Sequence, residues 1–227
     1  MEADTVKFDG TDSNMRIEHS GEIEWRTSKQ PVFYPEAIQF MEKRVNQIYN
    51  KTGPETVWLL EHHPVYTSGT RSNKRDLLDT GKFPVYPTGR GGEYTYHGPG
   101  QRVAYVMLDL NKRGSDIRCY VQNLGNWVIT ALAHFSINGM LRDDRVGVWV
   151  TDQTDKEKKI AAIGVRVRRW VSYHGIAINI KPELKHFDGI VPCGISKYGV
   201  TSLHALGKEI SLPEFDHALK KSFHTYF

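Results

Sequence analysis

Hydrophobic positions along the chain repeat with two different periods, and each period indicates a different kind of secondary structure. Short apolar runs, and runs in which apolar and polar residues alternate, are typical of strands. We therefore predict strands at residues 23–26, 56–60, 83–86, 103–110, 146–151, 159–167 and 171–180. Residues 61–71 follow neither period, so we expect a loop there.

Three other segments repeat their apolar residues every three or four positions, as the buried face of a helix does. The first opens at Pro35 and ends before Gly53–Pro54, because proline fits a first turn and Gly-Pro stops a helix. The second follows the strand at 103–110, and the last begins after Pro213. The apolar positions are Ile38, Met41, Val45 and Ile48, then Ile117, Val121, Leu124, Val128, Ala131 and Phe135, and finally Phe215, Leu219 and Tyr226.

The order of these elements predicts the fold class. Helices and strands are interspersed, yet several strands follow one another directly, which favours mixed pairing over a doubly wound parallel sheet. We expect one α/β (α+β) domain with a mixed, largely antiparallel sheet flanked by helices. The first residues are polar, so we expect residues 1–20 to be a mobile segment and residues 21–227 to be the domain.

Composition excludes several classes of protein. The chain of 227 residues is 39% hydrophobic and 25% charged, which suits a globular domain and excludes global disorder. No apolar run reaches the roughly 18 residues of a membrane span, and no secretory signal is visible. Two cysteines exclude a disulfide framework and favour a reducing, cytoplasmic location. A net charge of +4 is too small to indicate nucleic acid by itself.

The sequence lacks the common nucleotide, metal and hydrolase motifs. It has no Walker A motif, no CxxC, no HExxH and no GxSxG elbow. His62 and His63 are adjacent, and adjacent side chains point in different directions on a regular element. We therefore expect no metal site there.

One glycine-rich block, RGGEYTYHGPGQ at residues 90–101, is a candidate binding segment. Its glycines let the backbone approach a ligand closely. Glycines alone are more typical of a simple hairpin loop. The polar side chains that the block also carries, Arg90, Thr95, Tyr96 and His97, favour a binding site.

A second candidate is the pair of strands KIAAIGVRV and VSYHGIAINI. Folded as a hairpin with its turn near residues 168–170, they place Ala162 and Gly164 opposite Ala177 and Gly175 on one face. Such small residues leave a shallow trough in which an extended ligand can lie. The alternative is that a helix packs closely on this face. In the first case we expect a valine at Gly175 to leave the fold intact, because β-branched residues suit strands.

The third candidate is Cys193, which Pro192 and Gly194 place on a tight turn. A lone cysteine is more often inert, but a turn exposes it, and exposure is one condition for reactivity. Cys119 lies off the apolar stripe of its helix, so we interpret it as incidental. A thiolate nucleophile needs a cation nearby, since a free cysteine has a pKa of about 8.5.

Lys159 is the best candidate for that cation. In the hairpin it lies opposite Ile180, from which the chain runs on towards Cys193. Strict alternation, however, places Lys159 on the face opposite Ala162, so the pairing requires an irregularity at the strand end. Without one, Lys159 is an ordinary surface lysine.

Together the three blocks, the last being FDGIVPCGISKYGVTSL, resemble the signatures of the lipoyl(octanoyl) transferase family. The resemblance implies a fold like the catalytic domain of biotin- and lipoate-protein ligases. It also implies an acyltransferase that moves octanoyl from octanoyl-acyl carrier protein to a lysine ε-amine. The acceptors it implies are the lipoyl domains of 2-oxoacid dehydrogenases and the glycine cleavage H protein. It implies no cofactor and no metal, nucleic acid or membrane partner.

The resemblance also implies roles for residues. Cys193 would carry the acyl group as a thioester, and Lys159 would lower the pKa of its thiol. The substrate-binding residues that it implies are Arg90, Gly91, Gly92, Glu93, Tyr94, Thr95, Tyr96 and His97, then Ala162, Ile163 and Gly164, and Gly175, Ile176 and Ala177.

Three alternatives remain open. An ATP-dependent lipoate- or biotin-protein ligase on the same fold would form an acyl-adenylate and need no cysteine. A lipoyl amidotransferase would move octanoyl between two lipoyl proteins without the carrier protein. A non-catalytic module that binds the carrier protein would form no acyl-enzyme.

Overall fold

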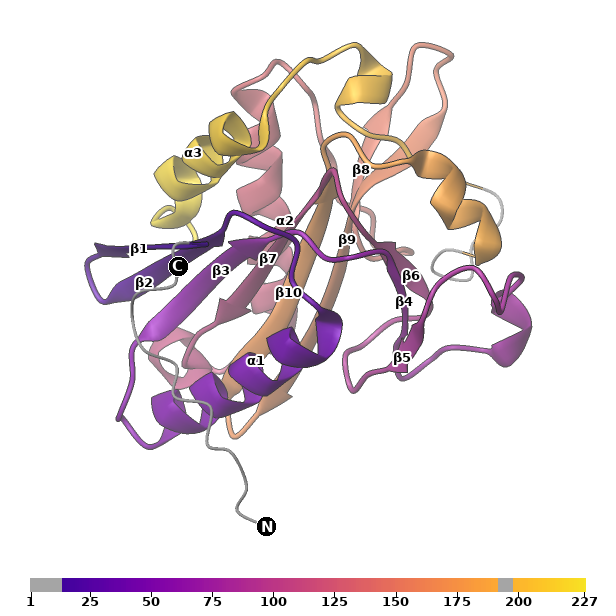
Figure 1. The fold of residues 1–227 in the computed structure, drawn as a ribbon. Coiled ribbons are helices and arrows are strands. Elements are labelled where there is room, and N and C mark those ends of the chain that lie inside the picture. The colour runs from indigo at the N-terminus through magenta and orange to yellow at the C-terminus, as the bar shows by residue number, and fades with distance from the viewer. Residues whose placement is uncertain (1–13, 192–197) are drawn as a thin grey trace.

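A seven-stranded sheet forms the centre of the protein, which is seen here in a computed structural model that describes residues 14–191 and 198–227 (Figure 1). The strand order is β1-β2-β3-β7-β10-β9-β8. Only β2 and β3 pair in parallel, and every other neighbouring pair is antiparallel. The strands are β1 (Met15–Ser20), β2 (Ile23–Ser28), β3 (Glu55–Leu60), β7 (Gln101–Met107), β8 (Val148–Thr151), β9 (Glu157–Arg168) and β10 (Val171–Asn179). The predicted mixed, largely antiparallel sheet is therefore confirmed.

Helices cover both faces of the sheet (Figure 1). Helix α1 (Tyr34–Tyr49) packs on one face, where Met41, Val45 and Ile48 join a buried cluster with residues of β3, β7 and β10. Helices α2 (Ile117–Ala133) and α3 (Leu212–Phe223) pack on the other face and on each other. A capping box between Ser211 and Glu214 begins α3. The expected stripes are mostly buried, but Ile117 is exposed at the start of α2.

A second, three-stranded sheet lies beside the first, with the order β5-β4-β6. Its strands are β4 (Val65–Ser68), β5 (Val85–Pro87) and β6 (Thr95–His97). The expectation that residues 61–71 form a loop is wrong, because β4 lies within them. Four short 3₁₀ helices complete the described elements: η1 (Lys74–Asp76), η2 (Leu110–Arg113), η3 (Leu184–Gly189) and η5 (His204–Leu206).

The hairpin of β9 and β10 has the register that the sequence predicts. Gly164 pairs with Gly175 and Ala162 with Ala177. Arg169 and Trp170 form the two-residue turn with φ angles of 52° and 63°. A hairpin turn with two positive φ angles matches the right-handed twist of its strands, even though glycine and asparagine are the usual residues for it.

The start of the described chain differs from the expected boundary. Residues 15–20 form β1, which pairs with β2 along its whole length, although we expected residues 1–20 to lie outside the domain. Within residues 14–191 and 198–227, no helix has the length and apolar character needed to cross a membrane.

Candidate active site

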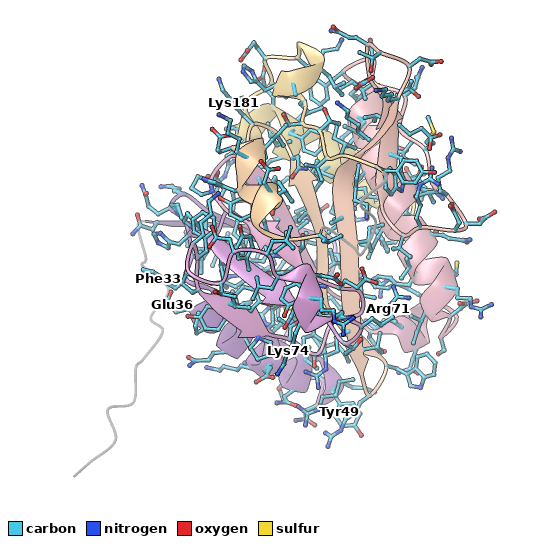
Figure 2. The ribbon with its side chains drawn as sticks, turned by 90° about the vertical axis from the view of Figure 1, so that its right-hand side faces the viewer. Phe33, Glu36, Tyr49, Arg71, Lys74 and Lys181 are labelled. Atoms are coloured by element: carbon cyan, nitrogen blue, oxygen red, sulfur yellow. The ribbon has the colours of Figure 1, made fainter. Side chains whose placement is uncertain are left out.

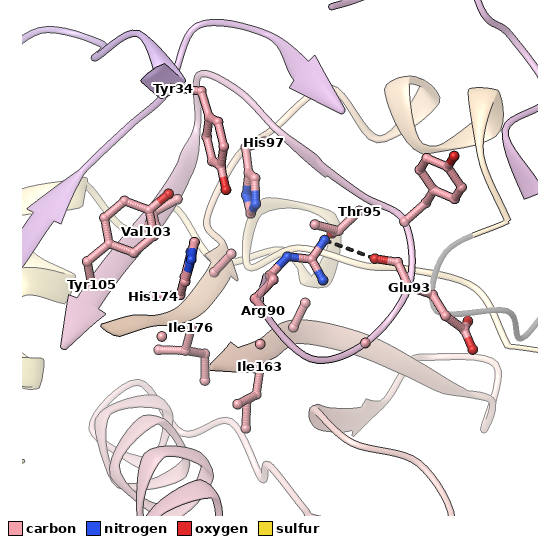
Figure 3. Close-up of a pocket in the computed structure, with 16 residues that line it drawn as sticks. Tyr34, Arg90, Glu93, Thr95, His97, Val103, Tyr105, Ile163, His174 and Ile176 are labelled. Atoms are coloured by element: carbon pink, nitrogen blue, oxygen red, sulfur yellow. Dashed lines mark hydrogen bonds between the residues drawn. The ribbon is translucent and has the colours of Figure 1, made fainter. Parts of the chain in front are cut away.

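A pocket of about 490 Å³, including its open mouth, lies between the sheet and the loop that leads into β6. Its floor is made by β7, β9 and β10, and its roof by the glycine-rich block and the start of α1 (Figure 3). We call it the acyl pocket, in line with the resemblance above. It is lined by Tyr34, Arg90, Gly92, Glu93, Tyr94, Thr95, His97, Val103, Tyr105, Ala162, Ile163, Gly164, His174, Gly175, Ile176 and Ala177.

Twelve of the fourteen residues expected to bind substrate line this pocket. The two exceptions are Gly91 and Tyr96. Gly91 donates its backbone N–H to the carbonyl of Val165, which joins the roof to β9. Tyr96 points to the other side of β6, into a cluster with Tyr66 and Phe187, where burial raises its pKa to about 12. Alternation along β6 explains why Thr95 and His97 face the pocket while Tyr96 does not.

Arg90 holds the roof in shape. Its guanidinium donates to the carbonyls of Thr67, Gly91 and Glu93 at 2.9–3.0 Å. It also donates to the Thr67 hydroxyl at 2.8 Å. Figure 3 shows the bond to Glu93 and the side chain above β9. Because the guanidinium is bonded to the loop backbone, Arg90 orders the roof and presents its aliphatic carbons to the pocket.

The small residues of the hairpin have different reasons for being small. A Cβ at Gly164 would lie 2.9 Å from Cδ of Arg90, so the roof loop requires the glycine. A Cβ at Gly175 would lie 2.1 Å from the carbonyl oxygen of Ala104 on the neighbouring strand. The expectation that valine is tolerated at Gly175 is therefore wrong, because backbone, and neither ligand nor helix, fills the space.

The residue before Gly175 has an unusual backbone conformation. His174 has a φ of 59° within β10, in the left-handed region that favours glycine. The kink turns the His174 ring into the acyl pocket, next to Tyr105, with the ring centroids 6.0 Å apart. Burial, with Arg90 nearby, lowers the pKa of His174 to about 3, so the ring is neutral. A non-glycine residue held in this conformation is a common mark of a functional site.

A polar cluster that the sequence did not predict lies at one end of the pocket and contains Tyr34, His62 and Tyr105. The Nδ1 of His62 lies 2.8 Å from the carbonyl of Val32, which can only accept, so Nδ1 carries the proton. Its Nε2 therefore accepts from the Tyr105 hydroxyl at 2.6 Å. Burial lowers the pKa of His62 to about 4, which keeps the ring neutral. An apolar run hides Tyr105 in the sequence, and only the pairing of β7 shows where it points.

His97 is held by a chain of side-chain amides. Asn179 donates to the carbonyl of Thr201 at 3.0 Å, and its oxygen accepts from Gln101 at 2.9 Å. The oxygen of Gln101 lies 2.7 Å from Nδ1 of His97. Each amide is thereby oriented, so Nδ1 of His97 donates and its Nε2 is left as an acceptor on the pocket side. Burial lowers the pKa of His97 to about 3.

Lys159 lies in a small recess that adjoins the acyl pocket, since Thr95 and Ala162 line both. Lys159 is only 5% exposed, and its ammonium has no hydrogen-bond partner among the described residues. The ammonium lies 4.8 Å from the centre of the Trp149 ring, a weak cation–π contact. A cation in this position can stabilise an anion that forms beside it.

Strand β9 contains the irregularity that is needed for Lys159 to face the same side as Ala162. Val148 pairs with Ala161 while Trp149 pairs with Lys159, so β9 has one extra residue, Ile160, at this point. Such a bulge interrupts the alternation of side chains. Lys159 and Ala162 therefore line the same recess, although strict alternation would separate them.

Cys193 lies outside the described residues, so its pairing with Lys159 stays a prediction. The described chain that follows Cys193 pairs with the backbone of Lys159. The carbonyl of Gly199 accepts from the Lys159 N–H, and the N–H of Thr201 donates to the Lys159 carbonyl. Cys119, by contrast, is exposed on α2, off the buried stripe as expected. The described residues contain no group of three or more His, Cys, Asp or Glu side chains that could hold a metal ion.

The fold and the pocket are those of an enzyme domain that attaches an acyl group to a protein. Residues 34–224 match the family described as the lipoyl protein ligase A/B catalytic domain. The chain is 58% identical to the octanoyltransferase of Paramagnetospirillum magneticum, over 90% of this chain and 97% of that one. It is 56% identical to the octanoyltransferase of Rhodospirillum rubrum, over 90% and 95%. The chain therefore belongs to the lipoyl protein ligase A/B family.

Solved structures show the same fold at much lower identity. A bi-partite lipoate protein ligase from Thermoplasma acidophilum superposes with a TM-score of 0.65 at 14% identity, over 92% of this chain and 84% of that one. A lipoate-protein ligase A bound with ATP gives 0.64 at 14% identity, over 87% and 83%. The expected likeness to the catalytic domain of lipoate-protein ligases is confirmed as a likeness of fold.

Proposed function

We propose that this protein is an octanoyltransferase that moves octanoyl from octanoyl-acyl carrier protein to the ε-amine of a lysine on lipoyl domains. The observation that carries the proposal is Lys159, a buried ammonium that has no hydrogen-bond partner among the described residues and lies beside a pocket whose floor is small and apolar. The close relatives named octanoyltransferase support the same reaction.

The first half-reaction is a thioester exchange at Cys193. Its thiolate attacks the thioester carbonyl, a new C–S bond forms, and the bond to the carrier sulfur breaks so that the carrier leaves as a thiolate. One thioester replaces another, so this step is close to isoenergetic. The Lys159 ammonium stabilises the negative charge on the Cys193 sulfur before the attack and on the carrier sulfur as it leaves. A buried cation is well suited to this role.

The second half-reaction forms an amide. The neutral lysine amine of the lipoyl domain attacks the Cys193 thioester, a C–N bond forms and the C–S bond breaks. The proton lost by the amine passes to the cysteine sulfur, with Lys159 positioned to transfer it. Splitting the transfer in two lets one site serve two bulky protein substrates in turn.

The same fold also serves ligases that use ATP, as the superposition on a ligase bound with ATP illustrates. The two reactions differ in what activates the acyl group. The thioester of the carrier protein is already activated, so the proposed enzyme needs no nucleotide. We propose lipoyl domains of 2-oxoacid dehydrogenases and the glycine cleavage H protein as acceptors.

An assay without nucleotide tests the proposal. Purified protein, octanoyl-acyl carrier protein and a lipoyl domain are mixed, and the mass of the lipoyl domain is followed. We expect octanoylation without ATP and none from free octanoate. Modification only from free octanoate plus ATP would identify a ligase instead. Transfer only from an octanoylated lipoyl protein would identify an amidotransferase.

A further inference from the structure

The acyl pocket has a direction, which its strands define. Lys159 shares its recess with Gln101 and Asn179, which pair with each other across β7 and β10. Beyond Gln101 and Asn179, the next pair of residues on the pocket face of the sheet is Val103 with Ala177. The pair after that is Tyr105 with Gly175. The reacting carbon lies at the Lys159 end if the proposed function holds, so the acyl tail points towards Tyr105.

The length of the pocket matches a medium acyl chain. Four residues of strand separate Gln101 from Tyr105, a distance of about 14 Å. An extended octanoyl chain measures about 9 Å from carbonyl to methyl, from C–C bonds of about 1.5 Å in a zigzag. Between these two positions Val103 pairs with Ala177, which pairs with Ala162 on β9, and all three line the pocket. At its far end stand two large rings, those of Tyr105 and His174.

Two hydrogen bonds of His62, one to the carbonyl of Val32 and one to the hydroxyl of Tyr105, fix the Tyr105 ring, and we call this pair of bonds the clamp. The carbonyl of Val32 sets the tautomer of His62, and His62 accepts the hydroxyl proton of Tyr105 at 2.6 Å. His62 is completely buried, and each of its two ring nitrogens is held by one of these hydrogen bonds. Figure 3 shows the Tyr105 side chain at one end of the pocket, beside His174 and below Tyr34.

We propose that Tyr105 is the end wall of the acyl pocket and that His62 is the positioning residue that holds this wall, so that the pair limits the length of the acyl chain that the pocket accepts. A rigid wall gives a sharp limit, because a longer chain must either displace the ring or leave its last carbons outside the pocket. The inference rests on the proposed function, since only that function says which end of the pocket holds the reacting carbon.

The adjacent histidine supplies a matched control. His63 follows His62 directly, but its ring stacks on Phe33 with centroids 4.1 Å apart and does not line the pocket. Phe33 is exposed, as its position at the edge of the molecule in Figure 2 shows. His63→Ala therefore removes an imidazole from the same segment without touching the clamp.

The test measures rates of transfer of octanoyl, decanoyl and dodecanoyl groups from the carrier protein. We expect the transfer rate of the parent protein to fall sharply between octanoyl and dodecanoyl. Tyr105→Leu removes the ring, so it should raise the decanoyl-to-octanoyl rate ratio about tenfold, as the burial of two more methylenes allows. His62→Phe leaves the ring but releases it, and should raise the same ratio by a smaller factor. His63→Ala should leave the ratio unchanged.

The outcomes separate the two proposals. A parent protein that transfers no octanoyl refutes the proposed function. A parent that transfers octanoyl and dodecanoyl equally well refutes the wall without any variant. An unchanged ratio in Tyr105→Leu, or an equal rise in His63→Ala, also refutes the wall. If Tyr105→Leu does not fold, Tyr105→Phe keeps the packing and removes only the clamp, and it should behave as His62→Phe does.

Discussion

At the scale of single residues, Lys159 carries its charge in a place where an ammonium group is costly. It is 5% exposed, its ammonium has no hydrogen-bond partner among the described residues, and it lies 4.8 Å from the centre of the Trp149 ring. A buried charge without a partner destabilises a protein, so we expect this charge to serve the proposed reaction.

Replacing Lys159 by methionine separates those two effects. Lys159→Met keeps the length of the side chain and removes the charge, so the melting temperature should hold or rise. Octanoyl transfer should fall by about a hundredfold or more, the usual range for a lost proton-transfer group. Thermal unfolding and the transfer assay check both results. A variant that is less stable yet active would show that Lys159 has a structural role only.

Gly175 gives a prediction about stability alone. A Cβ there meets the Ala104 carbonyl at 2.1 Å, whereas a Cβ at Gly91 meets nothing nearer than the Val165 carbonyl at 3.8 Å. Gly175→Ala should therefore lower the free energy of unfolding by about 2–3 kcal/mol, as overpacking does. Gly91→Ala should change it by about 0.5 kcal/mol or less. Urea unfolding measures both, and equal effects would contradict the close approach.

The residue types at the site could be read from the sequence, but their contacts could not. The small residues at 162, 164, 175 and 177 predicted the hairpin face correctly. The reason for Gly175 was wrong, because the φ of 59° at His174 leaves no trace in the pattern. Tyr105 lies in an apolar run that looks like ordinary core. Its role depends on His62, 43 residues earlier in the chain.

At the scale of elements, the turn between β9 and β10 is strained. Arg169 and Trp170 both have positive φ angles, which cost about 1–2 kcal/mol for residues with a Cβ. Trp170 is also 41% exposed, so it contributes little burial. The hairpin nevertheless keeps its register, in which Gly164 fits under the roof loop and Gly175 fits against the Ala104 carbonyl of β7.

Trp170→Gly should therefore stabilise the protein, and Trp170→Ala should not. Both remove the indole, so the difference between them isolates the backbone conformation. We expect the glycine variant to be more stable than the alanine variant by about 1 kcal/mol, which corresponds to about 2–4 °C in melting temperature. Equal melting temperatures would contradict the strain.

Most long elements were predicted well, whereas β1, β4 and β6 were not. The three helices and the strands of the large sheet other than β1 have clear periodic or apolar patterns. Strands β4 and β6 are four and three residues long and lie among glycines, prolines and polar residues, so no period can develop. From the sequence, the bulge at Ile160 could be inferred only from the position that the expected role of Lys159 requires. A bulge depends on how β9 pairs with β8, and the sequence pattern does not show that pairing.

At the scale of the whole molecule, the three buried histidines make stability depend on pH. Burial lowers the pKa values of His62, His97 and His174 to about 4, 3 and 3, compared with about 6.5 when unfolded. Unfolding therefore takes up three protons as the pH falls below 6.5. Asp216 acts in the opposite direction, because burial raises its pKa to about 6, and it releases one proton on unfolding.

Keeping these histidines neutral thus has no pH-dependent cost above pH 6.5, and the free energy of unfolding falls as the pH drops from 6.5 towards 3. With a net uptake of about two protons, the free energy of unfolding should fall by about 3 kcal/mol between pH 6 and 5. Urea unfolding at each pH measures the slope. His97→Gln should reduce it, whereas His134→Gln, at the exposed end of α2, should not. A flat profile would show that the rings are not buried as neutral groups.

The assembly of the site from distant segments is the part that the sequence describes least. The roof from residues 90–97, the floor from the β9–β10 hairpin and the end wall from His62 and Tyr105 meet only in three dimensions (Figure 3). The family resemblance supplied most of the pocket-lining residues, since twelve of fourteen line it. It did not supply His62, Tyr34 or His174.

The central claim is that octanoyl passes through Cys193, and intact mass spectrometry tests it most directly. The protein is mixed with octanoyl-acyl carrier protein and its mass is measured before a lipoyl domain is added. We predict a gain of one octanoyl group on Cys193 in the parent and in Cys119→Ser, none in Cys193→Ser, and loss of the adduct when the lipoyl domain is added. Octanoylation of the lipoyl domain by Cys193→Ser at the parent rate would contradict the account.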